Sequence, residues 1–192
     1  MRNNDSNLHN HIAKELVEMT QYDLQVREEL LKEGKLSPGY NPDMEHVHKK
    51  NAERLDEIIN SIGYPTKSIV GEEASQAAWL IVQHAISMPV FMKKCYALIP
   101  EAGDKISTQN LAYLYDRICY FEGRPQRYGT QFDSRDIYPV EDKELMIRFR
   151  RELRLSEHDE DYIVEIKSIG ANMDLHLSDK DFNQWRKQLG WI

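Results

Sequence analysis

A helical spacing of apolar residues repeats along most of the chain, and it constrains the fold more than any other feature. In the first segment these residues are three or four positions apart: Leu8, Ile12, Leu16, Met19, Tyr22, Val26 and Leu30. Such spacing places apolar side chains along one face of an α-helix. Similar stripes cover residues 47–62, 72–85, 91–100, 111–121 and 141–155. The sequence therefore predicts a mainly α protein, a compact bundle of about six helices with a structured polar loop and a small C-terminal appendage.

Helix-ending and helix-starting residues divide the chain at the expected places. Gly63 and Gly123 follow two of the stripes, and Asp43 is a candidate N-cap for the second helix because a short side-chain oxygen satisfies unpaired N–H groups. After Ser156 the pattern changes to an acidic run, then a short strand or turn, then a terminal helix. We therefore predict a helical core domain over residues 1–155 and an appendage over residues 156–192.

Charge and composition exclude several classes of function. The net charge of −7 argues against nucleic acid as a partner, because such binding needs a concentrated basic surface. No segment approaches the roughly 18 apolar residues of a membrane span, and the first residues lack the apolar stretch of a signal peptide. With two cysteines, Cys95 and Cys119, in apolar helical patterns, the sequence predicts reduced core thiols and a cytoplasmic protein without a membrane partner.

The usual sequence signatures of catalysis are absent. The chain lacks C-x-x-C, H-E-x-x-H, the P-loop pattern, G-x-G-x-x-G and G-x-S-x-G. We therefore do not expect the protein to be a P-loop NTPase, a dinucleotide-binding enzyme, a zincin or an α/β-hydrolase.

Polar residues nevertheless occupy positions inside the predicted helices. His48 and Asn51 lie one turn apart, and Asn51 shares the register of apolar neighbours. Gln83 and His84 directly follow the most apolar run of the chain. A buried amide needs hydrogen-bond partners, and a buried imidazole is either a satisfied core residue or a general base or metal ligand.

The fifth helix and the loop after it add a second group of polar residues. Asp116 can orient a histidine ring, and Arg117 can bind an anion bidentately or brace the loop. The loop over residues 123–133 is rich in glycine, amides and arginine. We expect its inward-facing residues to be Gln126, Tyr128, Thr130 and Gln131, and we expect the loop to lie across the face that carries His48 and His84.

Four motifs in this order resemble a bacterial family of domains of unknown function. They are H-x-x-N (residues 48–51), W-L-x-x-Q-H (residues 79–84), L-Y-D-R (residues 114–117) and P-Q-x-Y-G-T-Q (residues 125–131). The resemblance covers roughly residues 43–155. It implies a small helical protein whose polar motif residues form one constellation, and it brings no established activity or cofactor.

Three functions remain open from the sequence. The first is a hydrolase or phosphodiester-type enzyme, with His48 and His84 as acid and base and with Arg117 holding an anionic group. In it, Asn51, Gln83 and the inward loop residues bind the substrate. The second is a binding or immunity-type module whose buried polar network fixes the loop. The third is a metal-dependent hydrolase that uses His48, His84 and Asp116 as ligands. The sequence identifies neither a cofactor nor the small-molecule or protein ligand.

Overall fold

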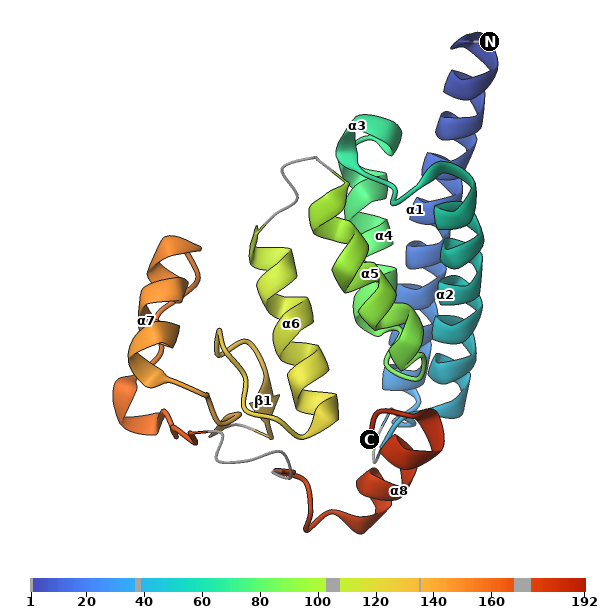
Figure 1. Ribbon diagram of the computed structural model, residues 1–192. Helices are drawn as coiled ribbons and strands as arrows, with labels where there is room; N and C mark the ends of the chain where they lie inside the picture. Colours follow the sequence, from blue (N-terminus) through green and yellow to red (C-terminus); the bar gives the residue numbers. More distant parts are fainter. Residues whose placement is uncertain (1, 37–38, 103–107, 135, 168–173) are drawn as a thin grey trace. The chain divides into compact units, whose positions relative to one another are not determined.

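The computed structural model describes residues 2–36, 39–102, 108–134, 136–167 and 174–192, and these ranges contain eight α-helices (Figure 1). The predicted mainly α fold is therefore confirmed. The chain divides into two compact units, Met1–Ile106 and Ser107–Ile192. Among the helices of the described ranges, none combines the length and the apolar character that crossing a membrane requires.

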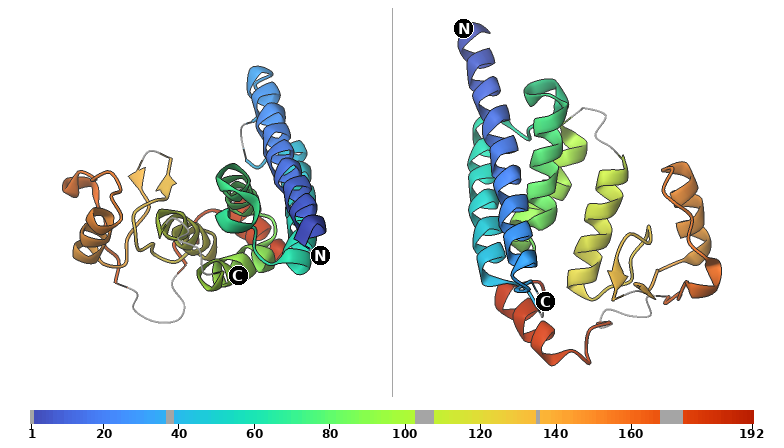
Figure 2. Two further views of the ribbon diagram at one scale, coloured as in Figure 1. Left: turned by 90° about the horizontal axis from the view of Figure 1, so that it is seen from above. Right: turned by 180° about the vertical axis from the view of Figure 1, so that it is seen from behind.

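The first unit is a helical bundle. Helices α1, α2 and α4 pack against one another, with α1 and α2 side by side (Figure 2), and α3 and α5 both contact α4. The helices are α1 (Arg2–Lys32), α2 (Pro42–Ile62), α3 (Lys67–Val70), α4 (Glu72–His84) and α5 (Pro89–Glu101). Fully buried apolar side chains from four of them form the core: Leu16, Leu55, Ile81, Val82 and Met92.

The start of α2 differs from the sequence-based expectation. The N-cap is Asn41 and not Asp43, because the Asn41 side-chain oxygen accepts hydrogen bonds from the backbone N–H of Asp43 (2.8 Å) and Met44 (3.2 Å). Pro42 occupies the first helical position, where its missing N–H costs nothing. Asp43 lies instead in the first turn, where its negative charge interacts favourably with the positive end of the helix dipole.

The second unit combines helices with a small antiparallel ribbon. Its elements are α6 (Thr108–Glu122), β1 (Phe132–Asp133), β2 (Asp136–Ile137), α7 (Lys143–Glu152), the 3₁₀ helix η1 (Glu160–Tyr162) and α8 (Lys180–Leu189). In the ribbon, Phe132 pairs with Ile137. Val140, Met146 and Ile163 form a small core. Residues 156–167 and 174–192 belong to this unit, and the predicted terminal helix is α8.

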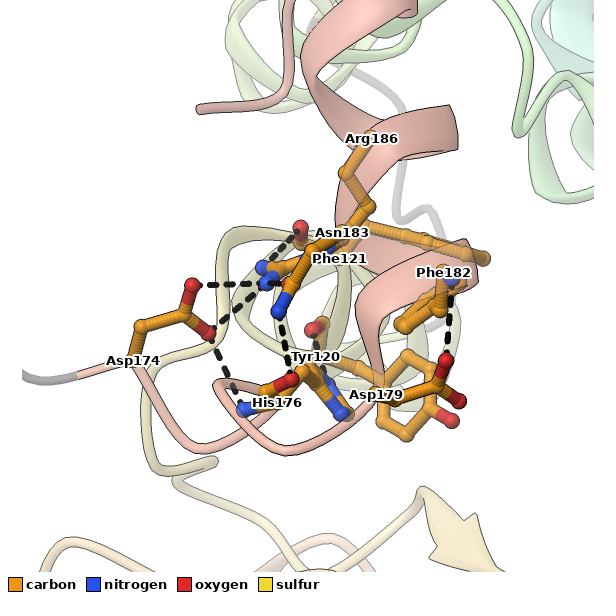
Figure 3. Close-up of polar contacts among 8 residues, drawn as sticks. All are labelled: Tyr120, Phe121, Asp174, His176, Asp179, Phe182, Asn183 and Arg186. Carbon is orange, nitrogen blue, oxygen red and sulfur yellow. Dashed lines mark hydrogen bonds and ion pairs between the residues drawn. The ribbon is translucent and has the colours of Figure 1, made fainter.

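The segment that contains α8 caps the end of α6 (Figure 3). The side chain of Arg186 is fully buried, pairs with Asp174 at 2.7 Å and donates from Nη1 to the Phe121 carbonyl at 3.1 Å. The Nε2 of His176 lies 2.9 Å from the Tyr120 carbonyl. The last carbonyls of a helix have no partner within the helix, so this segment satisfies two of them from outside.

Both cysteines are free and fully buried, Cys95 in α5 and Cys119 in α6. Burial raises the pKa of each thiol to about 12. The prediction of reduced core thiols agrees with this, because a protonated, buried thiol is unreactive.

Candidate functional site

The buried face of α1 carries a carboxylate. This face runs through Ile12, Leu16, Thr20, Asp23 and Leu30, at steps of three, four and seven residues. The stripe predicted from apolar residues alone was wrong in part, since Leu8 and Tyr22 are exposed. An α-helix has 3.6 residues per turn, so Thr20 and Asp23 lie on the same buried face as the apolar residues before them. Asp23 is only 1% exposed.

Two histidines from other helices meet this carboxylate. His48 lies on the buried face of α2, and His84 is the last residue of α4. One oxygen of Asp23, Oδ2, lies 2.8 Å from His84 Nδ1 and 3.3 Å from His48 Nε2. The two imidazole centroids are 4.8 Å apart. Three helices that are distant in sequence therefore place three ionisable groups at one point.

A tyrosine completes the contacts of His48. The Tyr40 hydroxyl lies 2.6 Å from His48 Nδ1, so both ring nitrogens of His48 face protein groups. Burial raises the pKa of the Tyr40 phenol well above its ordinary value. The hydroxyl thus stays protonated and orients the His48 ring. The His84 side chain is different, because 24% of it is exposed.

The Asp23 carboxylate is held ionised by the two histidines. Burial opposes its ionisation, but the contacts with His48 and His84 outweigh burial and hold the pKa of Asp23 well below its ordinary value of 3.8. Its second oxygen, Oδ1, is buried with no hydrogen-bond partner in the described part of the chain. The donor atoms of Asp23, His48 and His84 all lie within 4.8 Å of one another. Such a set can hold a proton or a divalent cation.

The other predicted site residues of the first unit lie near these histidines in sequence and are buried. Gln83 is 4% exposed and Asn51 is 6% exposed. The Asn51 amide donates to the Met19 carbonyl of α1 at 3.3 Å, which is a structural contact between helices. Asn51 also lines a surface hollow of about 310 Å³ between α1 and α2, together with Met19 and Lys50.

In the second unit, Asp116 organises the polar loop. Its carboxylate accepts hydrogen bonds from the backbone N–H groups of Arg127 (2.8 Å), Tyr128 (3.1 Å) and Thr130 (3.0 Å), and from the Thr130 hydroxyl (2.9 Å). Burial raises the pKa of Asp116 to about 6, while these hydrogen bonds act in the opposite direction. The carboxylate is fully buried and both of its oxygens are occupied. Asp116 therefore holds the loop in place.

The remaining predicted loop residues belong to the same network. The Gln126 side chain is fully buried, donates to the carbonyls of Gln131 and Tyr138, and accepts from the Gln131 N–H at 2.8 Å. The Gln131 amide donates to the Thr130 hydroxyl at 3.2 Å. A buried arginine, Arg150, donates to the Tyr128 carbonyl at 2.7 Å. Of the four residues expected to face inward, Gln126 and Thr130 are buried, whereas Tyr128 and Gln131 are half-buried.

Arg117 is half-buried on α6, and burial lowers the pKa of its guanidinium. Its use as an anion clamp stays a prediction. The placement of the loop across the face of His48 and His84 stays a prediction as well. Within each unit, however, the predicted residues do come together: His48 with His84 in the first unit, and Asp116 with the loop in the second.

Sequence reasoning missed Asp23 and Tyr40. Asp23 had a usable signal, because it continues the buried face of α1 once polar residues are counted. Tyr40 had none, because it lies in the loop before α2 and meets His48 only through the fold.

Comparison with known proteins gives a family and no function. No curated protein and no solved structure matches the chain. A family model described as a family of unknown function, DUF6624, matches residues 10–163. The match includes Asp23, His48, His84 and the Asp116 loop, and it ends before α8. The chain therefore belongs to the DUF6624 family.

Proposed function

We propose that the protein is a hydrolytic enzyme whose reacting centre is the cluster of Asp23, His48 and His84. One observation supports this above all others: a buried carboxylate holds the Nδ1 of a histidine that is itself partly open to solvent. An ionised carboxylate can only accept, so His84 Nδ1 is the donor, and its Nε2 keeps a lone pair. A lone pair fixed in this way can take a proton from an attacking water.

In this proposal the three side chains have different roles. His84 is the general base, because it is the member of the cluster that reaches solvent. Asp23 fixes the His84 tautomer and stabilises the imidazolium that forms. His48 is a positioning residue, since its nitrogens face Asp23 and Tyr40. The substrate class is that of carboxylic or phosphoric esters, whose hydrolysis needs an activated water.

The test is a hydrolase screen with chromogenic carboxylic esters, phosphomonoesters and phosphodiesters. We expect His84→Ala to lower kcat by roughly 10²- to 10⁴-fold, the usual contribution of a general base, with the far-UV circular dichroism unchanged. His46→Ala is the matched control, because His46 is an exposed histidine on the same helix as His48. If no substrate is hydrolysed above the His84→Ala background, or if that variant keeps full activity, the proposal is wrong.

A further inference from the structure

The strongest unexplained feature of the molecule is the charge of Asp23. Its ion-pair contacts in the described part of the chain are His48 and His84, and its Oδ1 atom is buried without a hydrogen-bond partner. Burial of a carboxylate is costly, and buried carboxylates are normally fully hydrogen-bonded, paired with a cation or bound to a metal.

The donor atoms also converge in the way that a metal ion requires. Ligands about 2.1 Å from one tetrahedral ion lie about 3.4 Å from one another. The distances from Asp23 Oδ2 to His84 Nδ1 and to His48 Nε2 are 2.8 Å and 3.3 Å, and the three donor atoms all lie within 4.8 Å of one another, close to the spacing that one ion requires. The three residues are on three separate helices, which hold the donors from three directions.

The surroundings of the cluster are also those of a metal site. The Tyr40 hydroxyl faces the outer nitrogen of His48, Nδ1, at 2.6 Å. Metal-bound histidines usually hydrogen-bond through this second nitrogen, which orients the ring. The side chains of Asp23 and His48 are 1% and 9% exposed, whereas that of His84 is 24% exposed. An open coordination position therefore lies on the side of His84.

We propose that Asp23, His48 and His84 bind one divalent transition-metal ion, with Zn²⁺ as the best fit to two nitrogens and one oxygen. Imidazole and carboxylate together suit Zn²⁺ and also Mn²⁺. The sequence-based ligand set of His48, His84 and Asp116 is thereby changed in one member. Asp116 has its oxygens occupied by the loop, whereas Asp23 has an oxygen to offer.

This inference deepens the proposed function, on which it rests for the identity of the reacting centre. A bound ion of this kind lowers the pKa of a coordinated water to about 7. Metal binding needs the lone pair of His84 Nδ1, whereas the metal-free mechanism needs that nitrogen to carry a proton. With a bound ion, the metal would supply the water activation, and His84 would be one of its ligands in place of acting as the base; the reacting centre would be the same.

Calorimetry on the full chain tests the site without any substrate. The protein is purified without a histidine tag, treated with a chelator, dialysed, and titrated with Zn²⁺ and separately with Mn²⁺. We expect one ion per chain. Asp23→Asn and His84→Ala should each weaken binding by more than about 100-fold, because loss of even an outer partner costs roughly 10- to 100-fold. His46→Ala should leave the affinity unchanged.

A second measurement keeps the test decisive if a variant folds poorly. Wild-type protein loaded with Co²⁺ should show the visible absorption of a tetrahedral nitrogen and oxygen site. Tyr40→Phe, which removes only the hydroxyl, should weaken Zn²⁺ binding by about 10-fold. Absence of stoichiometric binding, or binding that survives both Asp23→Asn and His84→Ala, overturns the metal site.

The two proposals fail in distinguishable ways. Stoichiometric Zn²⁺ with no hydrolysis of any substrate removes the enzyme and supports the metal site. Hydrolysis that persists in chelator, combined with no heat of binding, removes the metal site and leaves His84 as the base.

Discussion

The two buried aspartates of this protein have opposite hydrogen-bond environments. Asp116 accepts four hydrogen bonds from the loop, three from backbone N–H groups and one from a hydroxyl, and these occupy both oxygens. Asp23 receives two imidazole nitrogens on a single oxygen, and its other oxygen has no partner among the described residues. A carboxylate whose two oxygens both accept hydrogen bonds from the loop holds the loop in place. A carboxylate with an unused oxygen retains the capacity to bind a proton or a cation.

The buried ion pair at the end of α6 follows the pattern of Asp116. Arg186 is fully buried, and Asp174 faces its guanidinium with both oxygens. Its Nη1 and Nη2 groups also donate to the Phe121 carbonyl and to the Asn183 side chain, while Nε is buried without a hydrogen-bond partner among the described residues. The two opposite charges are paired in this cluster, which suits a structural role.

The largest expected loss of stability comes from a substitution at Asp116. Asp116→Asn replaces one accepting oxygen with an NH₂ group that faces N–H and O–H donors of the loop. At least one buried donor then loses its acceptor, so the free energy of unfolding should fall by about 3 kcal/mol. Urea denaturation measures this loss, and hydrogen exchange should localise it to residues 123–131.

Asp133→Asn is the control for this substitution, because Asp133 is exposed on the ribbon close to the same loop. It should change the free energy of unfolding by less than about 0.5 kcal/mol. An Asp116→Asn protein as stable as the wild type would mean that the loop does not depend on the carboxylate, and the contrast with Asp23 would be lost.

A smaller effect is expected from pH at His176. Burial and the nearby Arg186 charge lower its pKa from the ordinary 6.5, although the Tyr120 carbonyl, Asp174 and Asp133 oppose this. The unfolded chain therefore takes up a proton at a higher pH than the folded one. The stability contributed by neutral His176 is fully present above pH 6.5 and is lost as the pH falls toward the folded-state pKa, by up to about 1 kcal/mol at pH 5.5.

The difference between wild type and His176→Gln isolates this contribution. Glutamine can still donate to the Tyr120 carbonyl, but it does not titrate. Asp116, whose pKa is raised to about 6, acts with the opposite sign over the same range and is common to both proteins. Urea denaturation between pH 7.5 and 5.5 should show the wild type losing more stability than the variant; equal slopes would contradict the prediction.

The fold was largely predictable because it depends on local pattern. The apolar stripes and the glycines after them located the long helices, with bounds close to those of α2, α4 and α6. The errors came from side chains whose role depends on neighbours. Asn41 and not Asp43 caps α2, since capping is decided by which oxygen reaches the free N–H groups.

The site was predictable only in part, because tertiary contacts assemble it. The burial of Asn51 follows from its register among apolar residues, and that of Gln83 follows from its place after the most apolar run of the chain. The contact of the two histidines with Asp23 could not be predicted, because an aspartate in a helix is expected to face solvent unless its helix face is known to be buried. Asp23 shows that the helical period should be extended through polar residues when a buried face is assigned.

The smallest expected change in stability comes from replacing the other buried aspartate, Asp23, with asparagine. Asp23→Asn removes a buried charge that the two histidines stabilise, while the amide oxygen can still accept from His84 Nδ1, which lies 2.8 Å from the carboxylate. Because this hydrogen bond is kept, the free energy of unfolding should fall by less than about 1 kcal/mol, far less than for Asp116→Asn. Urea denaturation of metal-free protein at pH 7.5 measures this beside Asp116→Asn. A loss at Asp23 as large as that at Asp116 would show that both carboxylates are structural. A small loss combined with abolished Zn²⁺ binding would show that the Asp23 carboxylate serves a ligand rather than the fold.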